Sequence, residues 1–291
     1  MRALLQATGP GRVVAWQPCP LLSGCVDHYW LGIDSEPGST TLLPDGRVDV
    51  VLELTGAATT VRVYGAVTAR AEVPLQAGAT YVGVQFRPGR SRHFLASSAV
   101  ELTDRCVAGA DALACSLERV HDQASPDRAI AALEQALAAH LHRNPPQPSR
   151  VDHVVATLEA GCGPWRIGDV ARALEVSPRQ LERQFLRDVG LPPKQFAMIR
   201  RFNEAAAHLR ARRPAVVAAT DAGYADQSDM CRAFQRYIGQ TPAAYGRGDV
   251  TFLQDEKVWL DGPATCLPTD ARSHTAARSS GPKVGTDAVT T

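Results

Sequence analysis

A row of arginines with a spacing of four residues lies in the stretch SPRQLERQFLRDVG, residues 177–190: Arg179, Arg183 and Arg187. In a helix with 100° per residue these side chains share one face, while Leu181 and Phe185 lie on the opposite face. A guanidinium group can donate two parallel hydrogen bonds to a phosphate, or to the O6 and N7 atoms of guanine. The arginine face is therefore either a solvated helix surface or a surface that contacts DNA, and one helix does not decide between them.

The helix that carries this row has a defined first residue. Ser177 is a good N-cap, because its hydroxyl can accept a hydrogen bond from the first turn. Pro178 suits the first helical position, where the backbone N–H has no helical partner to lose. The pattern predicts a short amphipathic helix that packs through one face and presents cations on the other.

The same layout occurs a second time, 49 residues further along the chain. The matched pairs are Leu181 with Met230, Arg183 with Arg232, Phe185 with Phe234, Arg187 with Arg236, Gly190 with Gly239 and Pro193 with Pro242. Before the turn the shift is 48 residues, so the second copy has one extra residue in its turn. Two independent solvated surfaces need not share a layout, and the duplication therefore favours a common binding role.

Each copy has the pattern of a helix-turn-helix unit. An alanine, Ala171 or Ala219, precedes the apolar anchor by about ten residues, as close crossing of two helices requires. Between the copies, residues 193–212 predict one long helix. Its inward stripe is Phe196, Ile199, Phe202, Ala206 and Leu209. Such a helix is a rigid spacer that can hold two recognition helices about 34 Å apart, one turn of DNA.

Residues 150–247 resemble the AraC/XylS family of bacterial transcription regulators, whose DNA-binding domain joins two helix-turn-helix units by a long helix. The resemblance rests on these residues: Ala171, Ser177, Leu181, Phe185, Gly190, Arg201-Phe202-x-x-Ala205, Leu209 and GYADQSDMCRAFQRYIGQTP from Gly223 to Pro242. It implies double-stranded promoter DNA as the partner, and a DNA-binding set of Arg179, Gln180, Glu182, Arg183, Arg187, Gln227, Ser228, Asp229, Arg232 and Arg236. Within this set, the arginines late in each helix, Arg187 and Arg236, are expected near flanking phosphates, and the earlier residues near base edges.

Two acidic members of the set leave alternatives open. Glu182 is placed either to accept a hydrogen bond from cytosine N4 or only to temper the charge of the neighbouring arginines. Asp229 lies beside the second polar face, where a carboxylate should repel phosphate. The sequence therefore leaves open whether the second unit binds DNA as firmly as the first.

The length and the charge of the chain limit the number of domains and the possible classes of protein. At 291 residues the chain is long enough for two domains with their own cores. No window approaches about 18 uninterrupted apolar residues and the first residues lack the apolar core of a signal peptide, so a cytoplasmic protein without a membrane span is expected. The net charge of +1 does not identify a nucleic-acid binder. Residues 151–250 nevertheless carry 14 Lys and Arg against 11 Asp and Glu, whereas residues 1–150 carry 13 against 14, so the basic surplus lies in the helix-turn-helix region.

The seven cysteines are scattered and form no Cys-x-x-Cys pair, a pattern typical of reduced thiols. Cys25 and His28 have a spacing that occurs in metal sites, but a second pair with zinc-site spacing is missing. A buried thiol beside a histidine is the simpler interpretation. No metal site and no cofactor are predicted.

The region before the helical part has the composition of a β-rich domain. Short apolar runs broken by Gly, Pro and Asp predict strands within HYWLGI, RVDVVLEL, TTVRVYGAV and TYVGVQF, and helical character is expected after Arg90. Alternation through Val48, Val50, Leu52 and Leu54 predicts one buried face. This part of the chain, with LPDGRVDVVLEL and YVGVQFRPG, also resembles a small β-rich domain that precedes the same DNA-binding module in many bacterial regulators.

The fold class expected is α+β, a β-rich N-terminal domain followed by an all-α double helix-turn-helix domain. Residues 126–142 predict a helix whose stripe of Ile130, Leu133, Leu137 and Leu141 packs inside its own domain or against a second copy of the chain. The boundaries expected are 1–143 for a sensor or regulatory domain, 144–149 for a Pro-rich linker, 150–247 for the DNA-binding domain, and 248–291 for a largely disordered tail in which VTFLQDEKVWL is a candidate strand.

Two other classes of function compete with a sequence-specific transcription regulator. An enzyme is disfavoured, because the zinc-binding cysteines of DNA-repair proteins with this module, nucleophile elbows and phosphate loops are all missing, and Asp45 and Asp49 in LPDGRVD fit a turn better than an acid pair. An effector-sensing module is the third class, with five residues as candidate pocket lining or core: Trp30, Tyr64, Tyr81, Phe86 and Arg87. RNA polymerase, a small-molecule effector and a second copy of the chain are candidate partners.

Overall fold

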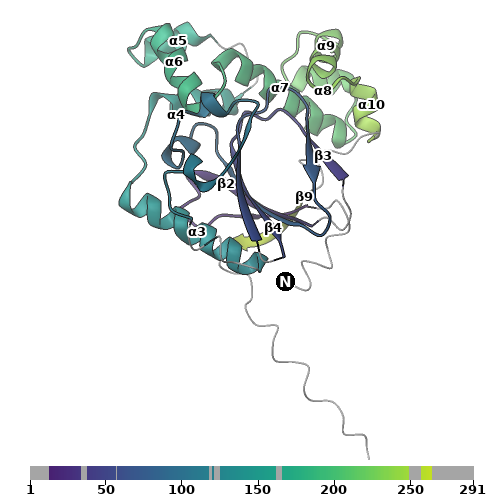
Figure 1. Ribbon diagram of the computed structural model, residues 1–291. Coiled ribbons are helices and arrows are strands. Elements are labelled where there is room, and N and C mark those ends of the chain that lie inside the picture. Colours follow the sequence, from purple (N-terminus) through teal and green to yellow (C-terminus); the bar gives the residue numbers. More distant parts are fainter. Residues whose placement is uncertain are drawn as a thin grey trace, which may run out of the picture.

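The computed structural model describes residues 13–33, 38–56, 58–117, 120, 125–161, 166–248 and 257–263. The β-rich part and the helical part pack against each other, with α5 and α6 at one side of the helical part and α8 and α9 at the other (Figure 1). The predicted class, a β-rich domain followed by an all-α double helix-turn-helix domain, is confirmed.

The main sheet has seven strands in the order β8-β5-β4-β7-β2-β1-β9, and β3 pairs with β6 in a second, two-stranded sheet. The strands of the first part are β1 (Val13–Gln17), β2 (Val26–Ile33), β3 (Gly38–Leu42), β4 (Asp49–Thr55), β5 (Ala58–Tyr64), β6 (Ala71–Leu75), β7 (Thr80–Phe86) and β8 (Cys106–Ala108). The four predicted strands correspond to β2, β4, β5 and β7, which are neighbours in the middle of the sheet and pair antiparallel.

One face of the main sheet forms the larger core of the β-rich part. Val48, Val50, Leu52 and Leu54 are all buried in it, as the alternation predicts. The other face is covered as well: Val51 and Glu53 are buried, and Arg62 pairs with the Glu53 carboxylate at 2.9 Å. The alternation therefore predicted one buried face where the structure has two.

Helix α3 (Pro126–Arg143) covers the larger core. Its stripe of Ile130, Leu133, Leu137 and Leu141 is buried against the sheet. Of the two alternatives left open by the sequence, packing within the same domain is the one observed. This stripe is not available to pair with a second copy of the chain unless that core opens.

Helical character does not begin directly after Arg90 in the form expected. The segment that follows contains three short 3-10 helices, η1 (Ser91–His93), η2 (Ala99–Leu102) and η3 (Ala110–Ala112), together with strand β8. A 3-10 turn needs only a few residues and no continuous apolar stripe, so the helical periodicity that identifies α3 is absent here.

The helical part consists of α4 (Arg150–Ala160), α5 (Ile167–Ala173), α6 (Pro178–Val189), α7 (Pro193–Arg210), α8 (Ala215–Asp221), α9 (Gln227–Ile238) and α10 (Pro242–Arg247). The predicted long helix is α7, and its whole inward stripe is buried. Phe185 contacts Phe196 edge-on, and Phe202 contacts both Phe234 and Tyr237. Helix α7 therefore joins the cores of both helix-turn-helix units. Among the described residues, no helix is both long and apolar enough to cross a membrane.

The chain returns to the β-rich part after the helices. Strand β9 (Lys257–Pro263) pairs parallel with β1 at the edge of the main sheet, in the region where VTFLQDEKVWL suggested a strand. The other residues of the predicted tail, apart from Gly248 at the end of α10, lie outside the described residues. The helical part is thus connected in sequence to the same sheet at both of its ends.

Candidate nucleic-acid interface

The first helix-turn-helix unit is built from α5 and α6. Ala171 in α5 is fully buried, and its carbonyl accepts a hydrogen bond from the Val176 N–H at 3.0 Å. Glu175 turns the chain with φ +53°. The hydroxyl of Ser177 accepts from the Gln180 N–H at 3.2 Å, which confirms the predicted N-cap.

The second unit, α8 and α9, repeats this backbone. Ala219 is buried, its carbonyl accepts from the Tyr224 N–H at 2.9 Å, and Gly223 turns the chain with φ +78°. Asp226 is the N-cap and accepts from the Asp229 N–H at 2.7 Å. The left-handed residue lies two positions before the N-cap in the first unit and three before it in the second. The extra residue inferred from the shift therefore lies in this turn, after Gly223.

The predicted DNA-binding residues lie on exposed helix surface in both units. Nine of them are exposed: Arg179, Gln180, Glu182, Arg183, Arg187, Gln227, Ser228, Arg232 and Arg236. Asp229 is half-buried. Leu181, Phe185, Met230 and Phe234, on the opposite faces, are completely buried. The structure thus brings each predicted set together on one helix face.

The arginines of the two faces differ in their partners. Among the described residues, Arg179 and Arg183 have no acidic partner within ion-pair distance. Arg232 Nη2 lies 3.4 Å from the carboxylate of Asp229. Arg187 Nε lies 2.7 Å from Asp188, a buried carboxylate that raises the pKa of the guanidinium through its hydrogen bond and its charge. Arg179 and Arg183 therefore carry charge that no carboxylate among the described residues compensates, and Arg236, which lies over the Tyr237 ring at 5.8 Å, has no such partner among them either.

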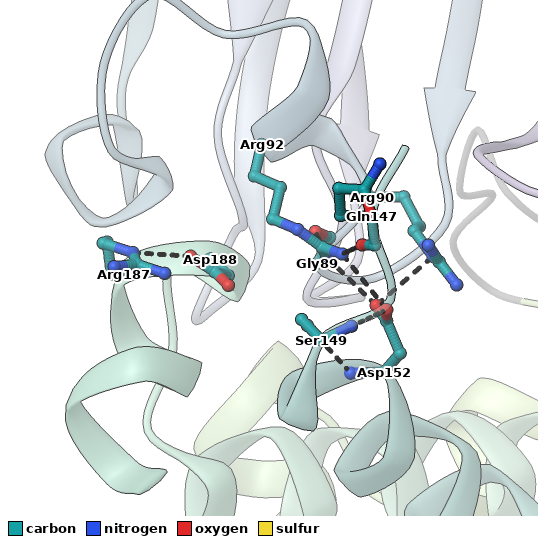
Figure 2. A network of polar contacts seen from close by, with 8 residues as sticks. All are labelled: Gly89, Arg90, Arg92, Gln147, Ser149, Asp152, Arg187 and Asp188. Carbon is teal, nitrogen blue, oxygen red and sulfur yellow. Dashed lines mark hydrogen bonds and ion pairs between the residues drawn. The ribbon is translucent and has the colours of Figure 1, made fainter. Parts of the chain in front are cut away.

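A second cluster of charges lies where the β-rich part meets α4 (Figure 2). Arg92 donates to both carboxylate oxygens of Asp152, at 3.0 and 3.1 Å, and Arg90 lies 3.3 Å from the same group. Asp152 also forms a capping box with Ser149 at the start of α4. Sequence reasoning missed this contact, although Ser149-x-x-Asp152 carries the local signal of a capping box.

The candidate effector residues do not lie together. Trp30 and Tyr81 are buried on the second face of the main sheet, and Tyr64 is packed against them. Phe86 belongs to the opposite core and stacks on Phe94, and Arg87 bonds to the Ser23 carbonyl in an exposed position. Of the two alternatives, core packing is the one observed for Trp30, Tyr81 and Phe86, and they lie on both faces of the sheet because consecutive strand residues point to opposite faces.

The carboxylates of Asp45 and Asp49 accept hydrogen bonds from other side chains. The Gln85 amide donates to Asp45 and to Asp49 at 3.1 Å each, and the Trp30 indole donates to Asp49 at 3.2 Å. Asp45 also accepts from the backbone N–H of Arg47, the short-range bond of a turn. The turn interpretation of LPDGRVD is supported by these bonds.

A histidine near the contact between the two parts predicts acid sensitivity. Burial, with the charges of Arg92 and Arg90 nearby, lowers the pKa of His93 from 6.5 to about 4, and its Nε2 atom is buried without a hydrogen-bond partner. A depressed pKa favours the neutral imidazole in the folded state, so His93 becomes protonated in the unfolded chain at a higher pH than in the folded one. The free energy of unfolding is therefore highest above pH 6.5 and falls as pH falls towards 4. Between pH 7 and pH 4.5 the free energy of unfolding should fall by about 2 kcal/mol less in His93→Gln than in the wild type. Urea unfolding at both pH values measures this difference. Equal losses in the two proteins would show that His93 does not titrate in this range.

Three solved structures show similarity to this chain. The C-terminal domain of AraT, a response regulator from Geobacillus stearothermophilus, is 24% identical over 34% of this chain and 85% of its own, with a TM-score of 0.32. The DNA-binding domain of AdpA, a global transcriptional factor solved in complex with a target DNA, is 24% identical over 35% of this chain and 93% of its own, with a TM-score of 0.33. ToxT from Vibrio cholerae is 10% identical over 75% of this chain and 98% of its own, with a TM-score of 0.46.

Family models match two segments of the chain. Residues 170–248 match a helix-turn-helix domain, and residues 15–108 match a domain of unknown function (DUF6597). No curated protein matches the sequence. The match shows a helix-turn-helix domain at residues 170–248. This domain is of the AraC type, so the resemblance stated from the sequence is confirmed.

Proposed function

We propose that the protein is a sequence-specific transcription regulator that inserts α6 and α9 into two adjacent segments of the DNA major groove. The observation that carries this proposal is the duplicated geometry. Both units turn on one left-handed residue, and both cap the second helix with a side-chain oxygen. Both also expose a polar face opposite a buried apolar anchor. A pair of matched exposed faces on two recognition helices is what reading of two successive groove segments requires.

In this proposal nine of the ten predicted residues contact DNA, in two ways. Arg179, Arg183 and Glu182 approach base edges from α6, with Gln180 beside them, and Gln227, Ser228 and Arg232 do so from α9. Arg187 and Arg236 contact flanking phosphates. The second face carries Asp229 against Arg232, so we assign the greater share of the electrostatic attraction to α6.

The remaining parts of the proposal concern the rest of the chain. The domain division is 1–143, a linker at 144–149, the DNA-binding domain at 150–247 and a tail from 248. The first domain is the candidate site for a small-molecule effector, supported by Trp30, Tyr64 and Tyr81 on one sheet face. Action in the cytoplasm, contact with RNA polymerase, dimer formation and the absence of an enzymatic activity are further elements of this hypothesis.

Binding of the full chain to DNA tests the proposal. We expect selection from a random duplex library to yield a common sequence. We further expect the affinity for it to fall roughly a hundredfold between 50 and 200 mM salt, the change for release of counterions at about four phosphates. Binding is measured by fluorescence anisotropy, with Arg179→Ala/Arg183→Ala as the matched loss variant and Arg128→Ala on α3 as the control for loss of an exposed arginine. Failure to enrich any sequence over random duplex would contradict the proposed function.

A further inference from the structure

The carboxyl ends of both recognition helices are held by hydrogen bonds from the β-rich part. The hydroxyl of Ser98 donates to the Arg187 carbonyl at 3.0 Å, and the hydroxyl of Thr103 donates to the Gly190 carbonyl at 2.6 Å. At the other unit, the backbone N–H of Arg70 donates to the Tyr237 carbonyl at 2.8 Å. The last four carbonyls of a helix have no partner within it, so these bonds satisfy groups that would otherwise need water.

The donors to the two helices belong to one connected structure, which we call the crossbar and define as residues 65–70 and 98–105. Asp104 joins its two segments: its carboxylate accepts from the Thr68 N–H and from the Thr68 hydroxyl, both at 2.7 Å. The Asp104 N–H donates to the Ala66 carbonyl, and the Gly65 N–H donates to the Arg105 carbonyl, at 3.0 Å each. Thr103 and Arg70, which bind the two helices, are thus one and two residues from the joined pair.

The crossbar is packed into the helical part as well as bonded to it. Ala66 is completely buried and belongs to the same apolar core as α6, α7 and α9. Gly190, at the end of α6, has φ +88°, and a Cβ added there would lie 3.1 Å from the Ala99 carbonyl oxygen. At Gly239, the equivalent residue of α9, no atom lies within 4 Å of an added Cβ. The contact at the first unit is therefore close backbone packing, whereas the contact of the crossbar with the end of α9 consists, among the described residues, of the Arg70–Tyr237 hydrogen bond and the burial of Ala66 in the shared core.

From these contacts we infer that the crossbar positions α6 and α9 relative to each other, so that residues outside the DNA-binding domain set the spacing of the DNA segments that the protein recognises. Helix α7, with the cores of both units packed on it, is one connection between them, and bending of this helix would change their relative position. A second connection at the ends of both recognition helices closes a ring and restricts that motion. This inference rests on the proposed function for its consequence at DNA, but not for its consequence in the free protein.

The positioning residues are Ser98, Thr103 and Asp104, none of which is among the predicted DNA contacts. Asp104 is informative because it has φ +56°, a conformation that glycine adopts without strain. Asp104→Gly removes both bonds to Thr68 while suiting the backbone, and Ser98→Ala/Thr103→Val removes the bonds to α6. Thr157→Val is the matched control, because the Thr157 hydroxyl bonds to the His153 carbonyl within α4.

The first experiment measures the distance between the units in the full chain without DNA. Spin labels carried by non-natural amino acids replace Arg172 on α5 and Val216 on α8, whose side chains are exposed and outside the crossbar. We expect one narrow distance distribution in the wild type and in Thr157→Val. We expect a distribution at least twice as wide in Asp104→Gly and in Ser98→Ala/Thr103→Val, with circular dichroism confirming that each protein is folded. Equally narrow distributions in all four proteins would overturn the inference and assign the spacing to α7 alone.

The second experiment measures spacing selectivity with the selected duplex and with copies that carry one or two extra base pairs between the two recognised segments. One base pair displaces the second segment along and around the helix by about a tenth of a turn. We expect the wild type to lose at least about tenfold in affinity per insertion, and the crossbar variants to lose about threefold or less. Equal losses would overturn the inference at the level of DNA. Failure of the wild type to select any duplex would instead contradict the proposed function, while the distance measurement would still judge the crossbar.

Discussion

Replacing Asp152 with alanine is expected to lower the free energy of unfolding by about 2–4 kcal/mol. The substitution leaves Arg92 and Arg90 without their shared carboxylate, in a site where the Arg92 and Asp152 side chains are only 15% and 16% exposed. Removing one partner of a largely buried ion pair leaves an uncompensated charge, which costs more than the pair contributes. The capping box of α4 is lost in the same variant, at a cost of about 1 kcal/mol. Urea unfolding of the full chain at pH 7 measures the change.

The matched control for this prediction is Asp169→Ala. Asp169 pairs with Arg172 one turn along α5, but both side chains are largely exposed, and such pairs contribute little. We expect a change within about 0.5 kcal/mol. A double-mutant cycle between Arg92 and Asp152 should give a coupling of about 1–3 kcal/mol, because the two groups are in direct contact. If Asp152→Ala were no more destabilising than Asp169→Ala, the cluster in Figure 2 would not hold α4 to the β-rich part.

The elements that form the candidate interface could be predicted because their signals are local. Ser177 and Pro178 define the start of α6, Gly190 defines its end, and the apolar stripe defines its buried face within 14 residues of sequence. Helix dihedrals repeat from residue to residue, so a short window contains the information that specifies them. The duplication provides a second, independent copy of the same pattern. The structure places the extra residue of that copy in the turn, where the shift changes from 48 to 49 residues.

The contacts that hold these elements could not be predicted from local patterns. Thr68 and Asp104 are 36 residues apart, and Arg92 and Asp152 are 60 apart. A hydrogen bond between distant residues depends on how the chain folds back, and nothing in the sequence near Asp104 indicates its partner. The burial of Glu53 has the same origin, because it depends on Arg62 from the neighbouring strand and on the cover over the second sheet face.

Replacing Arg183 with alanine is expected to weaken binding to the selected duplex by about 1–3 kcal/mol, a loss of roughly 5-fold to 150-fold in affinity. In the proposed function, two guanidinium donors of Arg183 bind guanine O6 and N7. The Arg183 side chain has no acidic partner among the described residues, so the substitution leaves no carboxylate unpaired there. The loss should fall on one base pair, with preference relaxed there and non-specific binding nearly unchanged. Arg128→Ala on α3 should leave both affinities as in the wild type.

Arg187→Ala is expected to act differently, because Arg187 lies at the last turn of α6 and pairs with the buried Asp188. A phosphate contact from this position should weaken binding to selected and random duplexes alike, and its removal should reduce the salt slope by about one. Both variants are measured on both duplexes across several salt concentrations, with circular dichroism to confirm folding. A solvated helix face predicts no material loss from either substitution. An equal loss on selected and random duplexes for Arg183→Ala would contradict its assignment to a base edge and would transfer that role to Arg179 or Glu182, two other exposed side chains of the same helix face.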